Sequence, residues 1–296
     1  ILYGLLLGMA LNYLSKEGRC IAGIGFSAKA VLRFGIALLG ARITVEQLMS
    51  LGITPIVIVV LGIPATIGFG YLMGRWLKLS REQSILTGSS VAVCGASAAL
   101  AVAAVLPNNK DAERNLIFTV ICVTSLSTVA MIIYPMIVTA LDLNPADSGV
   151  FLGATIHDVA QVVGAGYIMS TEIGDVATFT KLLRVSMLVP VVLVISIIVS
   201  RWSDVAETEG KVSRLPLPGF LIAFVLIVLL NSGGFIAVEI SSLMVDLSRW
   251  CLVIAMVALG MKSSFKELTD MGWRPMALMV GETLFLAVLV LICLKI

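Results

Sequence analysis

The sequence predicts an all-α membrane protein with about ten transmembrane segments. Three observations lead to this fold class. Hydrophobic residues make up 59% of the chain and charged residues 13%, and the mean hydropathy of +1.08 lies far from that of soluble domains. Apolar stretches of about 20 residues, the length that crosses a bilayer, follow one another along the chain. The loops between them are short, so we expect residues 1–296 to form a single transmembrane domain without a soluble part.

The apolar stretches give the expected segments in order. Their ranges are 1–14, 22–40, 51–74, 83–106, 115–141, 149–170, 177–201, 216–238, 247–262 and 273–295. The first is too short to cross, and the chain opens at Ile1 without a methionine. We therefore expect a further N-terminal helix before it, and no signal peptide with a cleavage site. Pro64, Pro135 and Pro190 lie inside segments and predict kinks.

Basic residues divide unevenly between the two sides that alternating loops define. One side carries 13 of the 20 basic residues: Lys16, Arg19, Lys29, Arg33, Arg75, Lys78, Arg81, Arg201, Lys211, Arg214, Lys262, Lys266 and Arg274. The other side carries Arg42, Lys110, Arg114, Lys181, Arg184, Arg249 and Lys295. The positive-inside rule makes the first side cytoplasmic and the C-terminus external. This basic surface orients the protein in the bilayer and requires no nucleic-acid partner.

An internal repeat links the two ends of the chain. Residues 39–58, LGARITVEQLMSLGITPIVI, align without gaps to residues 259–278, LGMKSSFKELTDMGWRPMAL. The two copies share their Leu-Gly, Gly and Pro spacing, and by segment count they cross in opposite directions. Inverted repeats are typical of secondary transporters. A weaker likeness joins 84–91 to 149–156, whose segments run the same way. Either one of these is re-entrant, or both share a small-residue start for a local reason.

Segment 83–106 contains GSSVAVCGASAALAVAAVLP, dense in Gly, Ser and Ala. Glycine weakens a helix by about 1 kcal/mol against alanine, so a break near Cys94-Gly95-Ala96-Ser97 is expected. A broken helix exposes backbone N–H groups that can hold an anion without a basic side chain. Ser90, Cys94, Ser97 and Ala101 share one helix face. Close packing through small residues is the structural alternative.

Segment 149–170, GVFLGATIHDVAQVVGAGYIMS, carries the only histidine of the chain, His157, beside Asp158. Ionisable side chains within a membrane span are costly and mark ion or substrate paths. Histidine changes charge near neutral pH, so this pair is a candidate for proton coupling. Gln161 shares a helix face with His157, and Thr155 lies on a neighbouring turn. A structural tie between helices is the alternative.

Glu282 is the other acid deep in a segment, and it could titrate or pair with Arg33 or Lys262. We expect no positive charge deep in the hydrocarbon, since Lys181 and Arg184 come nearest at the start of segment 177–201. An anion would then be held by helix ends, hydroxyls, Gln161 and protonated His157, and a cation by Asp158 and Glu282. With one His and no clustered Cys, no metal site is expected. The cysteines predict free thiols: Cys20, Cys94, Cys122, Cys251 and Cys293.

At these motifs the chain resembles the YeiH-like family of bacterial inner-membrane proteins, which are named as sulfate exporters. GSSVAVCGASAA, GATIHDVAQVVGAG and the two repeat copies carry the resemblance, which covers essentially all 296 residues. That family looks related to the cation/proton antiporter and bile-acid transporter superfamily. The resemblance therefore implies a multi-pass inner-membrane protein with inverted repeats and broken, crossing helices. One break would fall at Cys94–Ser97, and the segment that partners it stays open.

These observations predict a secondary transporter, not an enzyme, that exports a small sulfate-like anion without a cofactor. We expect the substrate site at Ser89, Ser90, Cys94, Gly95, Ala96, Ser97, Thr155, His157 and Gln161. We expect the coupling groups to be His157, Asp158 and Glu282, with protons or sodium as the coupling ion. The alternatives are a cation/proton antiporter using Asp158 and Glu282, and a membrane subunit of an ion-pumping enzyme with a soluble partner. A homodimer stays open.

Overall fold

The computed structural model describes residues 7–8, 10–15, 20–41, 44–50, 52–107, 110–200, 219–262 and 273–295. Every regular element in this part of the chain is helical. The N-terminal helices are η1 (Asn12–Ser15), α2 (Cys20–Phe26), η2 (Ser27–Val31), α3 (Leu32–Leu39) and α4 (Val45–Ser50). The central ones are α5 (Thr54–Trp76), α6 (Arg81–Ala92), α7 (Ala96–Ala103), α8 (Ala112–Ala140), α9 (Pro145–Thr155), α10 (Val159–Met169), α11 (Thr171–Ser186) and α12 (Leu188–Ser200). The C-terminal ones are α13 (Gly219–Ser232), α14 (Val238–Lys262) and α15 (Trp273–Lys295).

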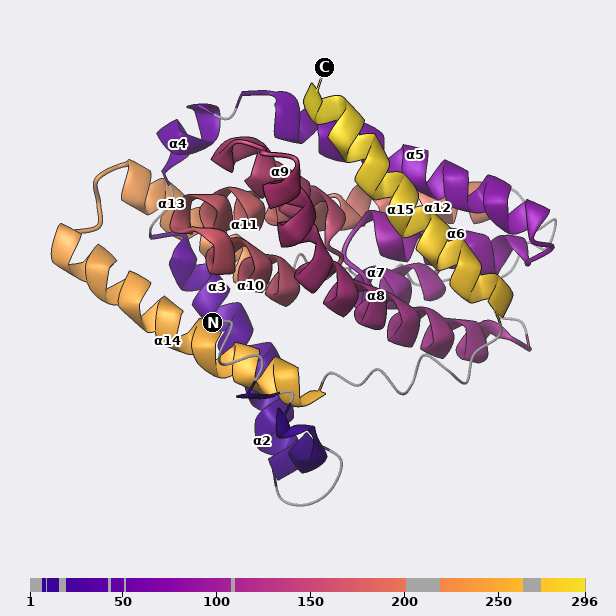
Figure 1. The fold of residues 1–296 in the computed structure, drawn as a ribbon, viewed down its shortest axis with the longest axis horizontal. Helices are drawn as coiled ribbons and strands as arrows, with labels where there is room; N and C mark the ends of the chain where they lie inside the picture. The colour runs from indigo at the N-terminus through magenta and orange to yellow at the C-terminus, as the bar shows by residue number, and fades with distance from the viewer. Residues whose placement is uncertain are drawn as a thin grey trace.

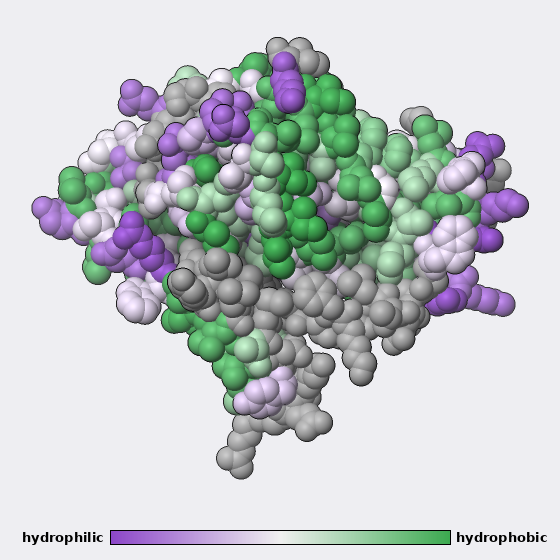
Figure 2. Space-filling model, viewed as in Figure 1, coloured by the Kyte–Doolittle hydropathy of each residue, from purple (hydrophilic) through white to green (hydrophobic). Residues whose placement is uncertain are grey.

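Five helical stretches are long and apolar enough to cross a bilayer. They are Cys20–Leu39, Thr54–Trp76, Arg114–Ala140, Thr171–Val199 and Trp273–Lys295. Large apolar side chains on α5, α12, α13 and α15 are exposed, as lipid-facing residues are. Figure 2 shows hydrophobic residues over the middle of the molecule and hydrophilic ones gathered at its left and right edges. The chain is therefore a multi-pass membrane protein, while the count of ten segments stays a prediction.

Segment 83–106 forms a helical hairpin instead of one continuous helix. Gln83, near the start of α6, and Leu106, just beyond α7, line one small pocket together with the start of α8 at Asn115. A straight helix would place residues 83 and 106 about 35 Å apart. The two arms must therefore fold back on one another, with their tip at Val93–Gly95. We call this pair of arms hairpin 1.

Segment 149–170 forms a second hairpin, which we call hairpin 2. A Cβ placed on Gly149, early in α9, would overlap Val176 of α11, and one on Gly166, late in α10, would approach Gly174 of α11 at 2.8 Å. Both arm ends thus contact the first turns of α11, although a straight helix would separate Gly149 from Gly166 by about 25 Å. The tip of hairpin 2 lies at Ile156–Asp158. Each of the two segments predicted as spans therefore folds back on itself, because each breaks near its middle.

The two hairpins start from opposite ends of α8. The base of hairpin 1 contacts the first residues of α8, whereas hairpin 2 follows directly after its last turn. A helix of 29 residues is about 43 Å long, enough to cross a bilayer. The similar stretches 84–91 and 149–156 therefore lie on the first arms of two oppositely directed hairpins. The two similar stretches thus occupy equivalent positions in two hairpins, and the origin of their likeness stays a prediction.

The remaining helices pack around the hairpins in pairs. Figure 1 shows α3, α13 and α14 on one side, α5, α6 and α15 on the other, and α9, α10 and α11 between them. Helix α3 packs on α14, where Ser248 Oγ donates to Gly35 O at 2.6 Å, and α5 packs on α15, where Phe69 and Phe285 stack at 4.3 Å. The first predicted repeat copy, 39–58, runs from the end of α3 into α5, and the second, 259–278, runs from the end of α14 into α15. The repeat stays a prediction, because 42–43, 51 and 263–272 lie outside the described residues.

Candidate functional site

The tips of the two hairpins meet in the core of the molecule. Gly95, the residue before α7, has φ +67° and ψ −126°, a conformation that favours glycine. A Cβ on Gly95 would lie 3.6 Å from His157 Cβ, so the two breaks are in contact. Ile156 and Asp158 have extended backbone conformations. Ile156 ends the first arm of hairpin 2, α9, and Asp158 precedes its second arm, α10. The break predicted at Cys94–Ser97 is thus present, and hairpin 2 is the partner that the sequence left open.

Two buried cations from α11 join the tips. Lys181 Nζ donates to Val93 O of hairpin 1 at 3.0 Å and to Ile156 O of hairpin 2 at 2.9 Å. The Arg184 guanidinium donates at 2.5–3.1 Å to three further backbone oxygens of the same hairpins, those of Val91, Ala92 and Ala154. The last carbonyl groups of a helix have no partner within the helix and carry a partial negative charge. Lys181 and Arg184 therefore cap the C-terminal ends of α6 and α9 at once.

The expectation of no positive charge deep in the hydrocarbon is wrong. Lys181 is 0% and Arg184 1% exposed. The predicted segment begins at residue 177, which puts both near its edge, whereas the helix begins at Thr171 and continues as an apolar stretch to Val199. The spacing Lys-x-x-Arg on one helix face was the available signal. The capping role of Lys181 and Arg184 could not be predicted from this spacing, because their acceptors are backbone carbonyl groups, which leave no pattern in the sequence.

His157 is fully buried and its ring is oriented by α15. Thr283 Oγ1 lies 2.8 Å from Met279 O, four residues earlier, and 3.1 Å from His157 Nε2. A hydroxyl has one proton to donate. The Met279 carbonyl can only accept, whereas His157 Nε2 donates to Thr283 or accepts from it according to the tautomer of the ring. His157 Nδ1 has no hydrogen-bond partner among the described residues, although the Val91 carbonyl lies near the ring.

Asp158 and Gln161 tie hairpin 2 to α8. The Asp158 carboxylate accepts from Ala160 N at 2.8 Å and so caps α10, while Asp158 N donates to Ser127 Oγ at 3.0 Å. Gln161 Nε2 donates to Thr128 Oγ1 at 2.8 Å, and its Oε1 is buried without a partner among the described residues. Both residues therefore shape the tip, and Gln161 keeps one acceptor unused.

The predicted residues of hairpin 1 divide into supporting and free groups. Ser90 Oγ donates to Gly95 O at 2.9 Å and holds the turn, whereas Ser89 Oγ is buried and lacks a described partner. Ser97 Oγ lies 2.9 Å from the sulfur of Cys94, which is buried. Ser97 itself is exposed, so one face of the tip is open.

Two other predicted residues take different places. Ala96, the first residue of α7, is partly exposed beside this open face. Thr155 Oγ1 donates to Phe151 O at 2.6 Å, one turn back in α9, so its hydroxyl is used within its own helix. The structure therefore gathers the predicted substrate-site residues at one tip-to-tip junction, with Thr155 supporting it from behind.

Glu282 lies apart from the tips, between α5, α6 and α15. Its Oε1 is 3.0 Å from Thr87 Oγ1, and it fills the space left by Gly70 and Gly88. Neither predicted basic partner is seen with it: Arg33 lies over the Phe220 ring, 5.9 Å from its centroid, and the side chain of Lys262 is outside the described part. Helix α15 nevertheless contacts both hairpins, because Glu282 is hydrogen-bonded to Thr87 of hairpin 1 and its neighbour Thr283 to His157 of hairpin 2.

Basic and acidic groups both lie at the tips. Lys181 and Arg184 are the basic side chains, the C-terminal ends of α6 and α9 carry roughly half a negative charge each, and the Asp158 carboxylate lies within electrostatic range of Lys181. Among the described residues, no carboxylate oxygen comes within 4.0 Å of either cation. The N-terminus of α10 is already occupied by its own Asp158, whereas α7 starts at Gly95 without a side-chain cap. Of the two helices that start at the tips, α7 therefore has the uncapped N-terminus.

Comparison with known proteins gives a family. The family profile described as Conserved hypothetical protein 698 matches residues 1–279. A UPF0324 membrane protein of Chlorobaculum tepidum is 51% identical over 98% of this chain and 81% of its own length. The UPF0324 membrane protein TauZ of Paracoccus denitrificans is 49% identical over 99% of this chain and 86% of its own length. No solved structure matches. These relatives carry neither the sulfate-exporter name nor a link to the antiporter superfamily, so both stay expectations.

Proposed function

We propose, from the premise that the chain belongs to the UPF0324 family of membrane proteins, that it is a secondary transporter of a small anion. The observation that carries the proposal is the junction of two opposed hairpin tips around Lys181 and Arg184, two buried cations without a described carboxylate partner. Broken helices near the middle of a bilayer form the substrate sites of many transporters. A sulfate-like ion suits a site whose donors are backbone N–H groups and cations.

The anion is held at the open start of α7. The first backbone N–H groups of a helix point along its axis and attract negative charge. Ala96 and Ser97 lie at this end and are accessible, and Lys181 stands behind it with two of its three donors used. His157 adds an imidazole that gains a positive charge and a second N–H donor when it is protonated. Export then requires the two tips to open alternately to each side.

A cation/proton antiporter that uses Asp158 and Glu282 is less well supported. The Asp158 carboxylate caps α10, and Glu282 contacts Thr87 between other helices. The two acids have no described contact partner in common, and the described residues contain no cluster of three or more His, Cys, Asp or Glu side chains that could hold a metal ion. The described tips also offer no nucleophile paired with a base, so an enzyme subunit is not favoured.

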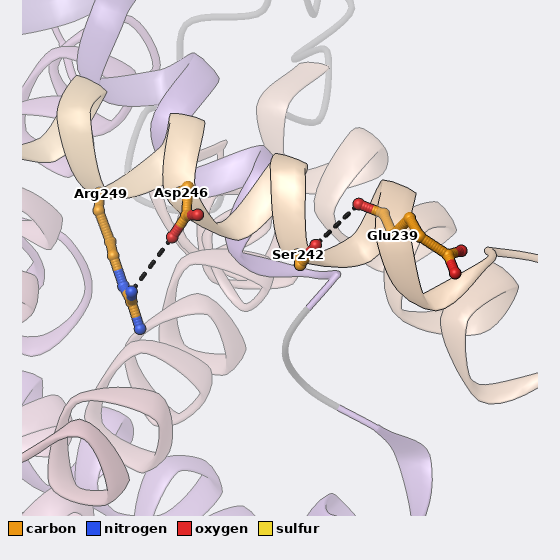
Figure 3. Close-up of polar contacts among 4 residues, drawn as sticks. All are labelled: Glu239, Ser242, Asp246 and Arg249. Atoms are coloured by element: carbon orange, nitrogen blue, oxygen red, sulfur yellow. Dashed lines mark hydrogen bonds and ion pairs between the residues drawn. The ribbon is translucent and has the colours of Figure 1, made fainter.

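Flux into proteoliposomes tests the proposed function. The purified chain should exchange labelled sulfate, and His157→Ala and Asp158→Asn should each reduce the flux and change its pH dependence, because both residues form the tip of hairpin 2. Asp246→Asn is the matched control, since this acid is exposed on α14 and pairs with Arg249 at 3.2 Å (Figure 3). If both tip variants keep the wild-type flux and pH profile, the site is elsewhere. Sodium-dependent proton movement with no anion effect would favour the antiporter.

A further inference from the structure

The carboxyl group of Glu282 is completely buried and has few polar neighbours. Glu282 is 0% exposed, and among the described residues the one hydrogen-bond partner of its carboxyl is Thr87 Oγ1, while Oε2 has none. A Cβ on Gly70 of α5 would overlap Oε1, and one on Gly88 of α6 would lie 3.5 Å from Oε1, in ordinary contact with it. No basic group comes within 4.0 Å in the part of the chain that the structure describes. An ionised carboxylate in such a place would be an uncompensated charge, which proteins avoid.

The hydrogen bonds of Thr87 indicate which form of Glu282 fits. Thr87 Oγ1 lies 3.0 Å from Glu282 Oε1 and 3.2 Å from Ser84 O. Thr87 has one hydroxyl proton, and the backbone oxygen of Ser84 can only accept. Ser84 O lies inside α6 and already accepts from the backbone four residues later, so the Thr87 proton is not required there. If Glu282 carries a proton on Oε1, it donates to Thr87 and Thr87 donates to Ser84 O, so both contacts are hydrogen bonds. If Glu282 is ionised, Thr87 donates to one of the two oxygens only.

We infer that Glu282 is the proton-binding group of this protein, held in its neutral acid form by Thr87 when α6 packs against α15. Loss of the proton would place a buried charge beside the backbone of Gly70 and Gly88, which is unfavourable unless water or a cation reaches it. Proton release is thereby linked to separation of hairpin 1 from α15. The proton itself can be measured without transport, and only its coupling role rests on the proposed function.

Few other ionisable groups face this carboxyl. From α5 and α6 the contacts are made by Gly70, Gly88 and Thr87, none of which titrates. The Cys122 thiol of α8 lies within electrostatic range. The neighbouring residue of α15, Thr283, is hydrogen-bonded to His157 of hairpin 2 at 3.1 Å. Glu282 and Thr283 thus connect an acid site at hairpin 1 with the imidazole at hairpin 2 through two adjacent residues of one helix.

Infrared spectroscopy of the lipid-reconstituted protein tests the inference directly. At neutral pH the wild type should show the C=O stretching band of a neutral carboxylic acid, and Glu282→Gln should lose it. Thr87→Val should keep the band but shift its frequency, because the hydrogen bond that polarises the acid is gone. Glu239→Gln is the matched control, since Glu239 is exposed on α14 (Figure 3) and should not change the band. An unchanged band in Glu282→Gln, or its absence from the wild type, would overturn the inference.

Flux measurements separate this inference from the proposed function. We compare anion flux driven by a pH gradient with anion counterflow, which needs no gradient. In Glu282→Gln, the ratio of these two fluxes should fall to the value measured when no pH gradient is applied. If the wild type shows the acid band but no anion flux, the inference about Glu282 stands and the proposed transporter function is wrong. If the wild type shows anion flux but no band assigned to Glu282, the proposed function stands and the inference about Glu282 is wrong.

Discussion

At the residue scale, the candidate site depends on a few side chains that are held in place largely by hydrogen bonds to backbone groups. His157 stands out in the sequence because a lone imidazole in an apolar segment is costly. Its tautomer is not predictable from sequence, since that depends on Thr283 of α15 and on the carbonyl four residues before it. Lys181 and Arg184 lie near a predicted segment boundary, whereas in the structure they bind carbonyl oxygens of both hairpins.

Gly95 provides a test at a single position. Gly95→Ala should lower the unfolding free energy by about 1–3 kcal/mol, because φ +67° with ψ −126° strains any residue with a Cβ. Space is not the cause, since the added Cβ would meet its nearest neighbour at 3.6 Å. Gly68→Ala in α5 is the control, where a Cβ meets nothing within 4 Å and a helix gains stability. Equal thermal unfolding midpoints in detergent for the two variants would contradict the strained tip.

At the element scale, hydropathy predicted where apolar segments lie but not how they are directed. Segments 83–106 and 149–170 each contain two short arms, and two arms of 8–12 residues have the same apolar length as one span. The composition did predict the break in hairpin 1. The fold-back itself depends on contacts with α8 and α11, such as Gly149 against Val176, which involve residues distant in sequence.

The capping of both hairpins by α11 gives a prediction for this element. Arg184→Met should lower the unfolding free energy by several kcal/mol, since each buried acceptor left unpaired costs about 1–3 kcal/mol and Arg184 serves carbonyls in α6 and α9. Lys181→Met should act in the same direction through Val93 and Ile156.

The control for this capping prediction is Arg249→Met on α14, whose exposed pair with Asp246 is worth less than about 1 kcal/mol (Figure 3). Thermal unfolding in detergent, followed by loss of helical signal, checks all three variants. If the α11 variants are no more destabilised than Arg249→Met, these cations do not hold the hairpins together.

At the scale of the whole molecule, the hairpins change the expected topology without moving the C-terminus. Because hairpin 1 returns to its own side, Lys110 and Arg114 join Arg75, Lys78 and Arg81 at one end of the molecule. The side expected to be cytoplasmic then carries 15 of the 20 basic residues instead of 13, which would strengthen the positive-inside bias. We expect two re-entrant hairpins in place of two crossings, so the C-terminus is still expected outside.

Cysteine labelling in intact cells tests this topology. In a variant without native cysteines, Lys78→Cys and Lys110→Cys flank hairpin 1 and should both be protected from an impermeant reagent added outside. Asp142→Cys and Glu172→Cys flank hairpin 2, are exposed, and should both react. Opposite labelling within either pair would mean that the segment between them crosses the membrane.

The most direct measurement is a structure of the lipid-embedded protein with selenate as a sulfate analogue, whose anomalous scattering locates the ion. The proposed anion site predicts a selenium peak between the hairpin tips, within hydrogen-bonding reach of the first N–H groups of α7 and close to Lys181 and His157. A peak only at the molecular surface, or a bound cation between Asp158 and Glu282 in place of the anion, would contradict it.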